Sequence, residues 1–121
     1  MPTLPLDIRQ ALARVQDRTA SERDLQKVVM RYARDHGWRA KHDIPARVSD
    51  GRVLTAFQGD AGFPDCVMVR APRLLLVELK GEKGTTSPAQ DLWLRPLGQV
   101  PGIEVYVWRP RDWPNIKAVL I

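Results

Sequence analysis

The sequence lacks several features that would define other kinds of protein. No apolar run among its 121 residues approaches the roughly 20 needed to cross a bilayer, so no membrane partner is expected. Its N-terminus has no basic stretch followed by an apolar one, unlike a signal peptide, and we expect a cytoplasmic protein. Cys66 is the only cysteine, which excludes an internal disulfide and a zinc site built from several cysteines. Because Cys66 lies in an apolar run, we expect a buried, unreactive thiol.

The composition that remains is that of one compact globular domain. Hydrophobic residues make up 44% of the chain and charged residues 27%, which are ordinary values for a soluble protein. Nineteen Lys and Arg against fourteen Asp and Glu give a formal net charge of +5. A small basic domain is compatible with a polyanionic partner such as nucleic acid, but charge alone does not identify one.

Two helices are predicted in the first third of the chain. Apolar residues at helical spacing indicate a helix over residues 6–18. Before the second helix Ser21 is a capping residue, and Asp24, three positions on, is the acidic half of a capping box. An apolar stripe follows, made of Leu25, Val28, Val29 and Tyr32. Gly37 is a natural stop signal for this helix.

Strand patterns dominate the middle of the chain. Residues 38–42 and 53–57 are candidate short strands. Residues 66–69 and 74–80 are apolar runs on either side of a tight connection at Ala71-Pro72, which predicts a β-hairpin. Alternation of apolar and polar residues over 103–108 indicates one more strand.

Two further helices are predicted in the last third. Residues 87–90, Ser-Pro-Ala-Gln, combine a capping residue, a proline at the first helical position and a glutamine three after the serine. Pro96 should end or kink that helix early. Residues 112–119 can form a short last helix. The order of elements predicts an α/β domain in which a mixed β-sheet is flanked by helices.

The end of the hairpin carries charges where an apolar strand would be expected to continue. Glu78 and Lys80 are two residues apart, so their side chains share one face of the strand. If the turn pairs Val69 with Leu74, the same register places Asp65 opposite Glu78. Directly opposed side chains have Cβ atoms about 5 Å apart, and two like charges there repel. Something must compensate this repulsion.

Three compensations are open at this point. Solvent and Lys80 can neutralise an exposed, charged strand end. Two carboxyls can share a proton, as in glycosidases. A divalent cation, Mg²⁺ or Mn²⁺, can bind both carboxylates and backbone oxygens. A lysine beside the pair lowers a carboxyl pKa and disfavours the protonated acid, which favours the cation. A metal ion beside an ammonium group suits phosphodiester chemistry, and the net positive charge of the chain agrees with such a substrate.

Several motifs together carry a resemblance to a known family. Pro64-Asp65, twelve further residues and then Glu78-Leu79-Lys80 resemble the signature of the PD-(D/E)xK nuclease superfamily. Within it the chain is most similar to the VRR-NUC family of virus-type replication-repair nucleases. The supporting blocks, in order, are residues 62–65 (GFPD), 78–80 (ELK), 87–93 (SPAQDLW) and 105–110 (VYVWRP). The likeness covers residues 20–121. It implies a restriction-endonuclease-like core, a nuclease domain over residues 21–121 and a helical extension over residues 1–20.

The resemblance implies a metal site with Mg²⁺ or Mn²⁺ as the cofactor and no small-molecule cofactor. Asp65 and Glu78 match the metal-binding acids of the family, and the backbone carbonyl of Leu79 matches a third ligand. Lys80 matches the lysine that orients or activates the attacking water. Glu22 matches a helical glutamate that reaches the metal from the other side, as a further ligand and catalytic residue.

Gln90 matches a glutamine that supports the catalytic site. Gln90 and Glu22 also have structural explanations, because Gln90 completes a capping box and any glutamate in the first turn of a helix favours its dipole. Asp65 can also cap a local turn after Pro64. Asp60 is interpreted as a loop residue.

The function implied is metal-dependent hydrolysis of DNA phosphodiester bonds by an activated water, without a covalent enzyme intermediate. Stand-alone members of the family can act as homodimers that resolve four-way junctions, and a two-fold dimer presents two identical sites to two strands. Residues 1–20 and the apolar tail 118–121 are candidate interface segments, or they pack on their own core. A monomeric flap or nicking nuclease, a nuclease subunit of a larger complex and an inactive nucleic-acid-binding module stay open.

DNA contacts are expected from basic residues near the proposed site, chosen for their charge and position rather than from any motif. They are Arg39, Lys41, His42, Arg47, Lys83 and Arg95. Lys41 and His42 can also form a solvated strand end. Phosphate contacts by such residues predict DNA binding that is strongly sensitive to salt.

Overall fold

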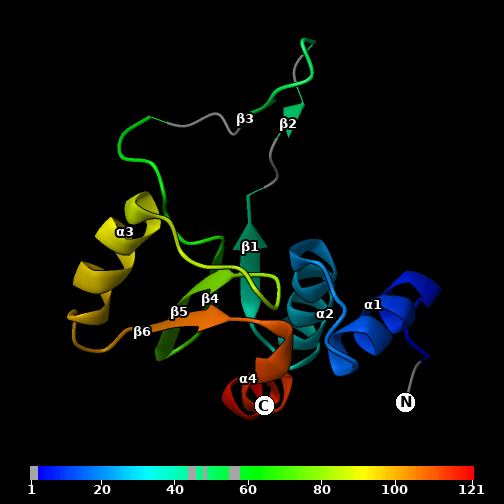
Figure 1. Cartoon of the computed structure of the whole chain (residues 1–121). Helices are drawn as coiled ribbons and strands as arrows, with labels where there is room; N and C mark the ends of the chain where they lie inside the picture. The colour runs from blue at the N-terminus through cyan, green and yellow to red at the C-terminus, as the bar shows by residue number, and fades with distance from the viewer. Residues whose placement is uncertain (1–2, 44–45, 48, 55–57) are drawn as a thin grey trace.

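The structure is a computed structural model of the chain. It describes residues 3–43, 46–47, 49–54 and 58–121, with the backbone alone at 46–47 and 53–54. The element order is that of an α/β protein, as predicted (Figure 1). In the described part of the chain, no helix has the length and apolar character needed to cross a membrane.

The first two helices match the prediction closely. Helix α1 spans Leu6–Gln16 and helix α2 spans Glu22–Asp35. The Ser21–Asp24 capping box forms in full, because the Ser21 hydroxyl accepts the Asp24 N–H and the Asp24 carboxylate accepts the Ser21 N–H. Gly37 follows the helix with φ of 83°, a left-handed conformation that suits glycine at a helix end.

A four-stranded mixed sheet forms the centre of the molecule (Figure 1). Its strands are β1 (Arg39–His42), β4 (Cys66–Arg70), β5 (Arg73–Leu79) and β6 (Glu104–Trp108). Their order across the sheet is β1-β4-β5-β6, with the first two pairs antiparallel and β5–β6 parallel. The hairpin pairs Val69 with Leu74, the register expected from the tight turn. The mixed sheet flanked by helices is therefore confirmed.

Two short strands, β2 (Ala46–Arg47) and β3 (Val53–Leu54), pair with each other as a separate antiparallel ribbon. The strand predicted over residues 53–57 begins where expected. Residues 55–57 lie outside the described residues.

The remaining helices are α3 (Pro88–Gly98), a 3₁₀ turn η1 (Pro110–Asp112) and α4 (Trp113–Leu120). The prediction that Pro96 ends α3 early is wrong, because the helix continues to Gly98. Pro96 lies in the last turn of α3 and has no N–H to donate to the carbonyl of Leu92. Leu92 is exposed, so water can replace that bond at small cost.

One hydrophobic core joins the sheet to α1, α2 and α4. Val15 of α1, Leu25 of α2 and Leu120 of α4 all belong to it and are almost wholly buried. The helical extension and the C-terminal tail therefore both pack on the core of the same chain. Helix α3, which the structure describes throughout, has no buried residue, and Figure 1 shows the sheet lying between α3 and α2.

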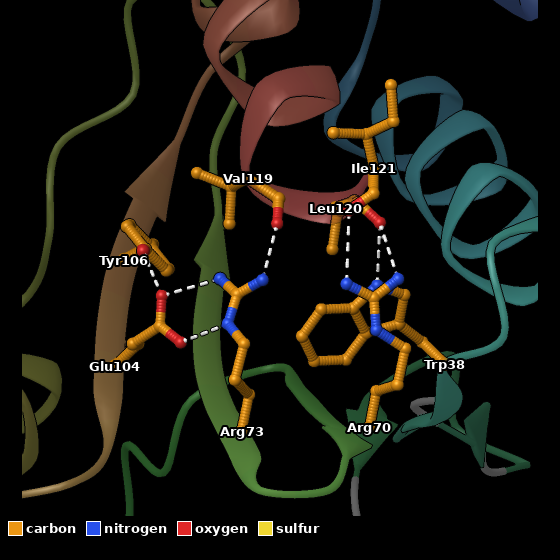
Figure 2. Close-up of polar contacts among 8 residues, drawn as sticks. All are labelled: Trp38, Arg70, Arg73, Glu104, Tyr106, Val119, Leu120 and Ile121. Carbon is orange, nitrogen blue, oxygen red and sulfur yellow. Dashed lines mark hydrogen bonds and ion pairs between the residues drawn. The ribbon is translucent and has the colours of Figure 1, made fainter.

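The turn end of the hairpin holds the last helix through two arginines, Arg70 and Arg73 (Figure 2). Both guanidinium groups lie over the ring of Trp38, at 4.5 and 4.9 Å from its centroid. They donate hydrogen bonds to backbone carbonyls of His36, Val119, Leu120 and Ile121. Arg73 also makes a two-pronged ion pair with Glu104, with both distances 2.7 Å. We call Arg70, Arg73 and Trp38 the turn-end clamp.

Candidate active site

The open end of the hairpin brings Asp65 and Glu78 together, as the register predicts. Cys66 pairs with Val77, so Asp65 and Glu78 follow as the next opposed residues on a common face. An Asp65 carboxylate oxygen accepts the backbone N–H of Leu79 at 3.0 Å. Since the N–H and C=O of one strand residue point to the same side, the Leu79 carbonyl also faces the Asp65 strand.

Glu78 is the only buried charged side chain in the described part of the chain, with 1% of its surface exposed. The solvated strand end that the sequence left open is therefore wrong for Glu78. One carboxylate oxygen, Oε1, accepts a hydrogen bond from Gln90 Nε2 at 3.1 Å. The other, Oε2, is buried without a hydrogen-bond donor among the described residues, because the neighbouring Asp65 carboxylate can only accept. A buried carboxylate oxygen in this state is costly unless a proton or a cation reaches it.

The pKa of Glu78 is raised to about 9. Burial is the largest cause, followed by hydrogen-bonding proximity to Asp65 and by the negative charge of Asp65; Glu22 adds a smaller contribution. Lys80 lowers this pKa, as expected, but burial and Asp65 outweigh it. The expectation that Lys80 holds the pKa of Glu78 down is therefore wrong, because burial and Asp65 raise that pKa above its ordinary value.

Gln90 completes the capping box and also contacts Glu78, so its position fits both explanations that the sequence offered. Its side-chain oxygen accepts the Ser87 N–H at 2.9 Å, and its backbone N–H donates to the Ser87 hydroxyl at 3.2 Å, which completes the capping box of α3. Its side-chain nitrogen donates to Glu78. The cap holds the amide in the orientation that presents its N–H to the carboxylate, so capping and support of the site are one arrangement.

Glu22 and Lys80 bring further charge to the same place. Glu22 is the first residue of α2. Its pKa is raised, first by partial burial of the carboxyl and then by the charge of Asp65, while Lys80 lowers it. Glu22 is exposed as a whole residue, and the influence of Asp65 and Lys80 on its pKa places its carboxyl near both of them. Lys80 follows β5 on the Glu78 face, and its backbone N–H donates to the Trp108 carbonyl at 2.9 Å.

The loop before Asp65 is docked on the first turns of α3, a feature that sequence reasoning missed. Gly62 has φ of 96°, and a Cβ there would lie 2.5 Å from the Ala89 carbonyl carbon and oxygen. Only glycine fits so close an approach in this conformation. The indole N–H of Trp93 donates to the carbonyls of Asp60 and Ala61 at 3.2 and 3.1 Å. Gly62 in the GFPD block was the signal available in the sequence, since a residue without a side chain is needed where two backbones touch.

His42 lies at the site end of β1, because it pairs with Cys66 next to Asp65. Its pKa is lowered, chiefly by burial and then by Arg34, against the opposing effects of Asp43 and Asp65. His42 is thus adjacent to the candidate active site, as the sequence suggested.

The other proposed DNA contacts are spread more widely. Lys41 is exposed and lies 3.5 Å from Asp43. Arg39 pairs with Val69 at the far end of β1, about 10 Å along the strand from His42. Lys83 and Arg95 are exposed, on the turn after β5 and on the last turn of α3. The side chain of Arg47 lies outside the described residues.

Asp60 lies in the loop before the site, as interpreted from the sequence. Cys66 is fully buried, and burial raises the pKa of its thiol to about 12, with smaller contributions from Asp65, Glu78 and Asp43. The predicted burial of the thiol is confirmed, and its raised pKa agrees with low reactivity.

The metal-binding potential of the site is smaller than the resemblance implies. Within the described residues, no three His, Cys, Asp or Glu side chains lie close enough together to hold a metal ion. A ready-made set of Asp65, Glu78 and Glu22 is therefore not present. Two carboxylates with a backbone carbonyl still fit Mg²⁺, which commonly binds one or two carboxylates and keeps several waters. The unpartnered Glu78 oxygen fits the same interpretation.

No protein-family model matches the chain, and neither a curated protein nor a solved structure matches it significantly. Function must therefore be argued from the site itself.

Proposed function

We propose that the chain is a Mg²⁺- or Mn²⁺-dependent nuclease that hydrolyses DNA phosphodiester bonds. The observation that carries the proposal is the buried Glu78 carboxyl beside the half-buried Asp65, with one Glu78 oxygen to which no described residue donates a hydrogen bond. Gln90 holds the other oxygen, and Lys80 lies within electrostatic reach of Glu78. Asp65, Glu78 and Lys80 lie at the end of one hairpin. Among the groups of side chains in the described residues, this one suits phosphoryl chemistry best.

The arrangement of elements supports a restriction-endonuclease-like core. A helix, α2, precedes three antiparallel strands, β1, β4 and β5, and α3 then leads to β6, parallel to β5. The acids lie on the central hairpin, as the VRR-NUC resemblance implies. On this basis, our proposal includes membership of the PD-(D/E)xK superfamily.

The residues divide the work as follows. Asp65, Glu78 and the Leu79 carbonyl would hold the cation, which when bound supplies a polarised phosphoryl oxygen and a more acidic water. Lys80 would orient that water and stabilise the charge that develops on the phosphate. Gln90 fixes the Glu78 carboxylate in place. Glu22, which is exposed and within reach of Asp65, would contact metal-bound water rather than the metal itself.

Cleavage of DNA by the purified protein tests the proposal. Wild type is expected to cut DNA with Mg²⁺ or Mn²⁺ and to stop in excess EDTA. Asp65→Asn and Lys80→Met should each lower the rate by about 10³-fold or more. Lys117→Met is the matched control, because it removes an exposed ammonium from α4 and should leave the rate unchanged. Cleavage that persists in EDTA, or in the Asp65→Asn variant, would contradict the assignment.

A narrower form of the proposal is a homodimer that resolves four-way junctions. The alternatives are a monomeric flap or nicking nuclease, a subunit of a larger nuclease complex and an inactive binding module. Light scattering combined with a cleavage panel of flap, fork, four-way junction and linear duplex separates them. A monomer that cuts flaps and ignores junctions would refute the resolvase form alone. DNA binding without cleavage under all metal conditions would identify a binding module.

A further inference from the structure

An aromatic pair, the exposed Phe63 and the half-buried Trp93, lies beside the candidate active site. Phe63 is two residues before Asp65, and Trp93 is one helical turn after Gln90, so each ring is carried by a segment that also carries a site residue. The ring centroids are 5.0 Å apart at an interplanar angle of 84°, an edge-to-face arrangement. Phe63 keeps 43% of its surface exposed.

Contacts between the loop before Phe63 and helix α3 hold the aromatic pair in place. The indole N–H of Trp93 is bonded to two carbonyls of the loop that leads to Phe63. Gly62 presses the same loop against the backbone of Ala89 and Gln90, with no room for a side chain between them. The Phe63 ring is therefore presented to solvent by a fixed loop, next to the carboxylates that the proposed function assigns to phosphodiester cleavage.

From this arrangement we infer that Phe63, supported by Trp93, is a stacking surface for an unpaired nucleobase next to the phosphate that is cut. The inference rests on the proposed function and names its substrate class as DNA with unpaired or unstacked nucleotides. A base in an intact duplex has both faces covered by its neighbours, whereas an unpaired base can stack on an aromatic ring. The net charge of +5 of the whole chain favours a polyanionic partner over a basic peptide.

Binding without cleavage tests the inference separately from the activity. Labelled duplex, duplex with a two-nucleotide gap and single-stranded DNA of the same sequence are titrated in EDTA and followed by fluorescence anisotropy. Wild type should bind gapped and single-stranded DNA more tightly than intact duplex. Phe63→Ala should lose about tenfold in affinity for the unpaired forms and less than twofold for the duplex. Phe63→Tyr should restore the difference.

Two matched variants make the comparison specific to the aromatic face. Leu92→Ala removes an exposed apolar side chain, 79% accessible, from the residue next to Trp93 and should change none of the affinities. Phe63→Leu keeps an apolar contact with Trp93 but has no ring, so it should behave as Phe63→Ala even if the alanine variant is unstable. A 2-aminopurine in the gap should be quenched by wild type and not by Phe63→Leu.

The outcomes separate the inference from the function on which it rests. A wild type that cuts DNA but whose Phe63 variants bind all three DNAs as wild type does overturns the stacking surface alone. Equal losses for duplex and gapped DNA also overturn it. If Phe63→Leu changes the mass of the particle in light scattering, the pair is an interface between copies of the chain and the inference fails. A preference for unpaired DNA that depends on Phe63 supports the inference even if no metal restores cleavage.

Discussion

The two ends of the β4–β5 hairpin treat charge in opposite ways. At the turn end, Arg70 and Arg73 donate hydrogen bonds to backbone carbonyls, and Arg73 also donates to Glu104 (Figure 2). Both guanidinium groups lie over the ring of Trp38. At the open end, Asp65 and Glu78 face each other and one buried oxygen has no partner in the described structure. One hairpin therefore joins a satisfied charge network to an unsatisfied one.

The difference indicates what each end is for. Two-pronged arginine pairs and carbonyl contacts are strong, geometrically specific interactions that fix a terminus to a sheet. A buried carboxyl with a pKa of about 9 instead costs stability at neutral pH, and such groups concentrate at functional sites. We therefore expect changes at the turn end to alter stability without altering chemistry, and changes at the open end to alter chemistry together with the pH dependence of stability.

The largest effect is expected from Glu78→Gln. Between pH 4.5, the ordinary pKa of a glutamate, and about 9, the folded protein binds a proton that the unfolded chain has released. The contribution of Glu78 is thus most favourable below pH 4.5 and is lost as the pH rises toward 9, with a slope of at most about 1.4 kcal/mol per pH unit. Urea unfolding in EDTA at pH 6 and 8.5 should show this decline in wild type and a flatter profile in Glu78→Gln. Cleavage should fall by about 10³-fold or more.

Metal addition provides the control for this prediction. Mn²⁺ should raise the unfolding midpoint of wild type more at pH 8.5 than at pH 6, because binding the cation requires loss of the Glu78 proton. Glu78→Gln should respond little at either pH. A variant with the same pH profile as wild type would show that Glu78 is not the proton-binding group, and the contrast between the two ends would lose its main support.

Arg73→Ala is the matching change at the turn end. It removes the ion pair with Glu104, the bond to the Val119 carbonyl and the contact with Trp38, and it leaves the half-buried Glu104 with only the Tyr106 hydroxyl as donor. We expect a loss of about 2–3 kcal/mol in the free energy of unfolding, measured by urea denaturation. Arg73→Lys should recover part of it, because an ammonium keeps the charge but not the fork. Cleavage per folded molecule should stay at the wild-type rate; a large loss would show that the ends are coupled.

Local signals in the sequence account for the part of the site that prediction recovered. The capping residues Ser21 and Ser87 and the tight hairpin turn each fix structure within a few residues, and the register of the hairpin then places Asp65 opposite Glu78. These features follow from side-chain hydrogen bonding and strand periodicity, which need no tertiary information.

What the sequence could not supply depends on contacts between distant segments. Glu78 is buried and accepts a hydrogen bond from Gln90 on α3, and neither its raised pKa nor this contact was predictable from spacing. The clamp joins Arg70 to residues 34 to 51 positions away. The approach of Gly62 to Ala89 has the same origin.

A smaller effect is expected where cap and site share one side chain. Gln90→Glu keeps an oxygen for the Ser87 N–H but replaces the N–H that Glu78 accepts, so it should lower cleavage about tenfold while α3 stays capped. Ser87→Ala breaks the cap from the other side and should cost about 1 kcal/mol in unfolding free energy. Its cleavage should fall less than that of Gln90→Glu. If Ser87→Ala has the larger effect on cleavage, Gln90 acts only through the helix.

The smallest effects are expected from exposed ion pairs, and here stability and DNA binding should separate. Lys41 lies 3.5 Å from Asp43 on the strand that ends at the site, and Arg31 lies 3.1 Å from Asp35 on α2. Either alanine variant should change the unfolding free energy by only about 0.5 kcal/mol or less, because solvent screens both pairs. If Lys41 contacts a phosphate, Lys41→Ala should weaken DNA binding at every sequence and reduce the slope of log affinity against log salt by about one. Arg31→Ala has the same charge change and should leave that slope as in wild type. If Lys41→Ala and Arg31→Ala both keep the wild-type slope of log affinity against log salt, the DNA lies away from the β1 end, on the α3 side of the hairpin.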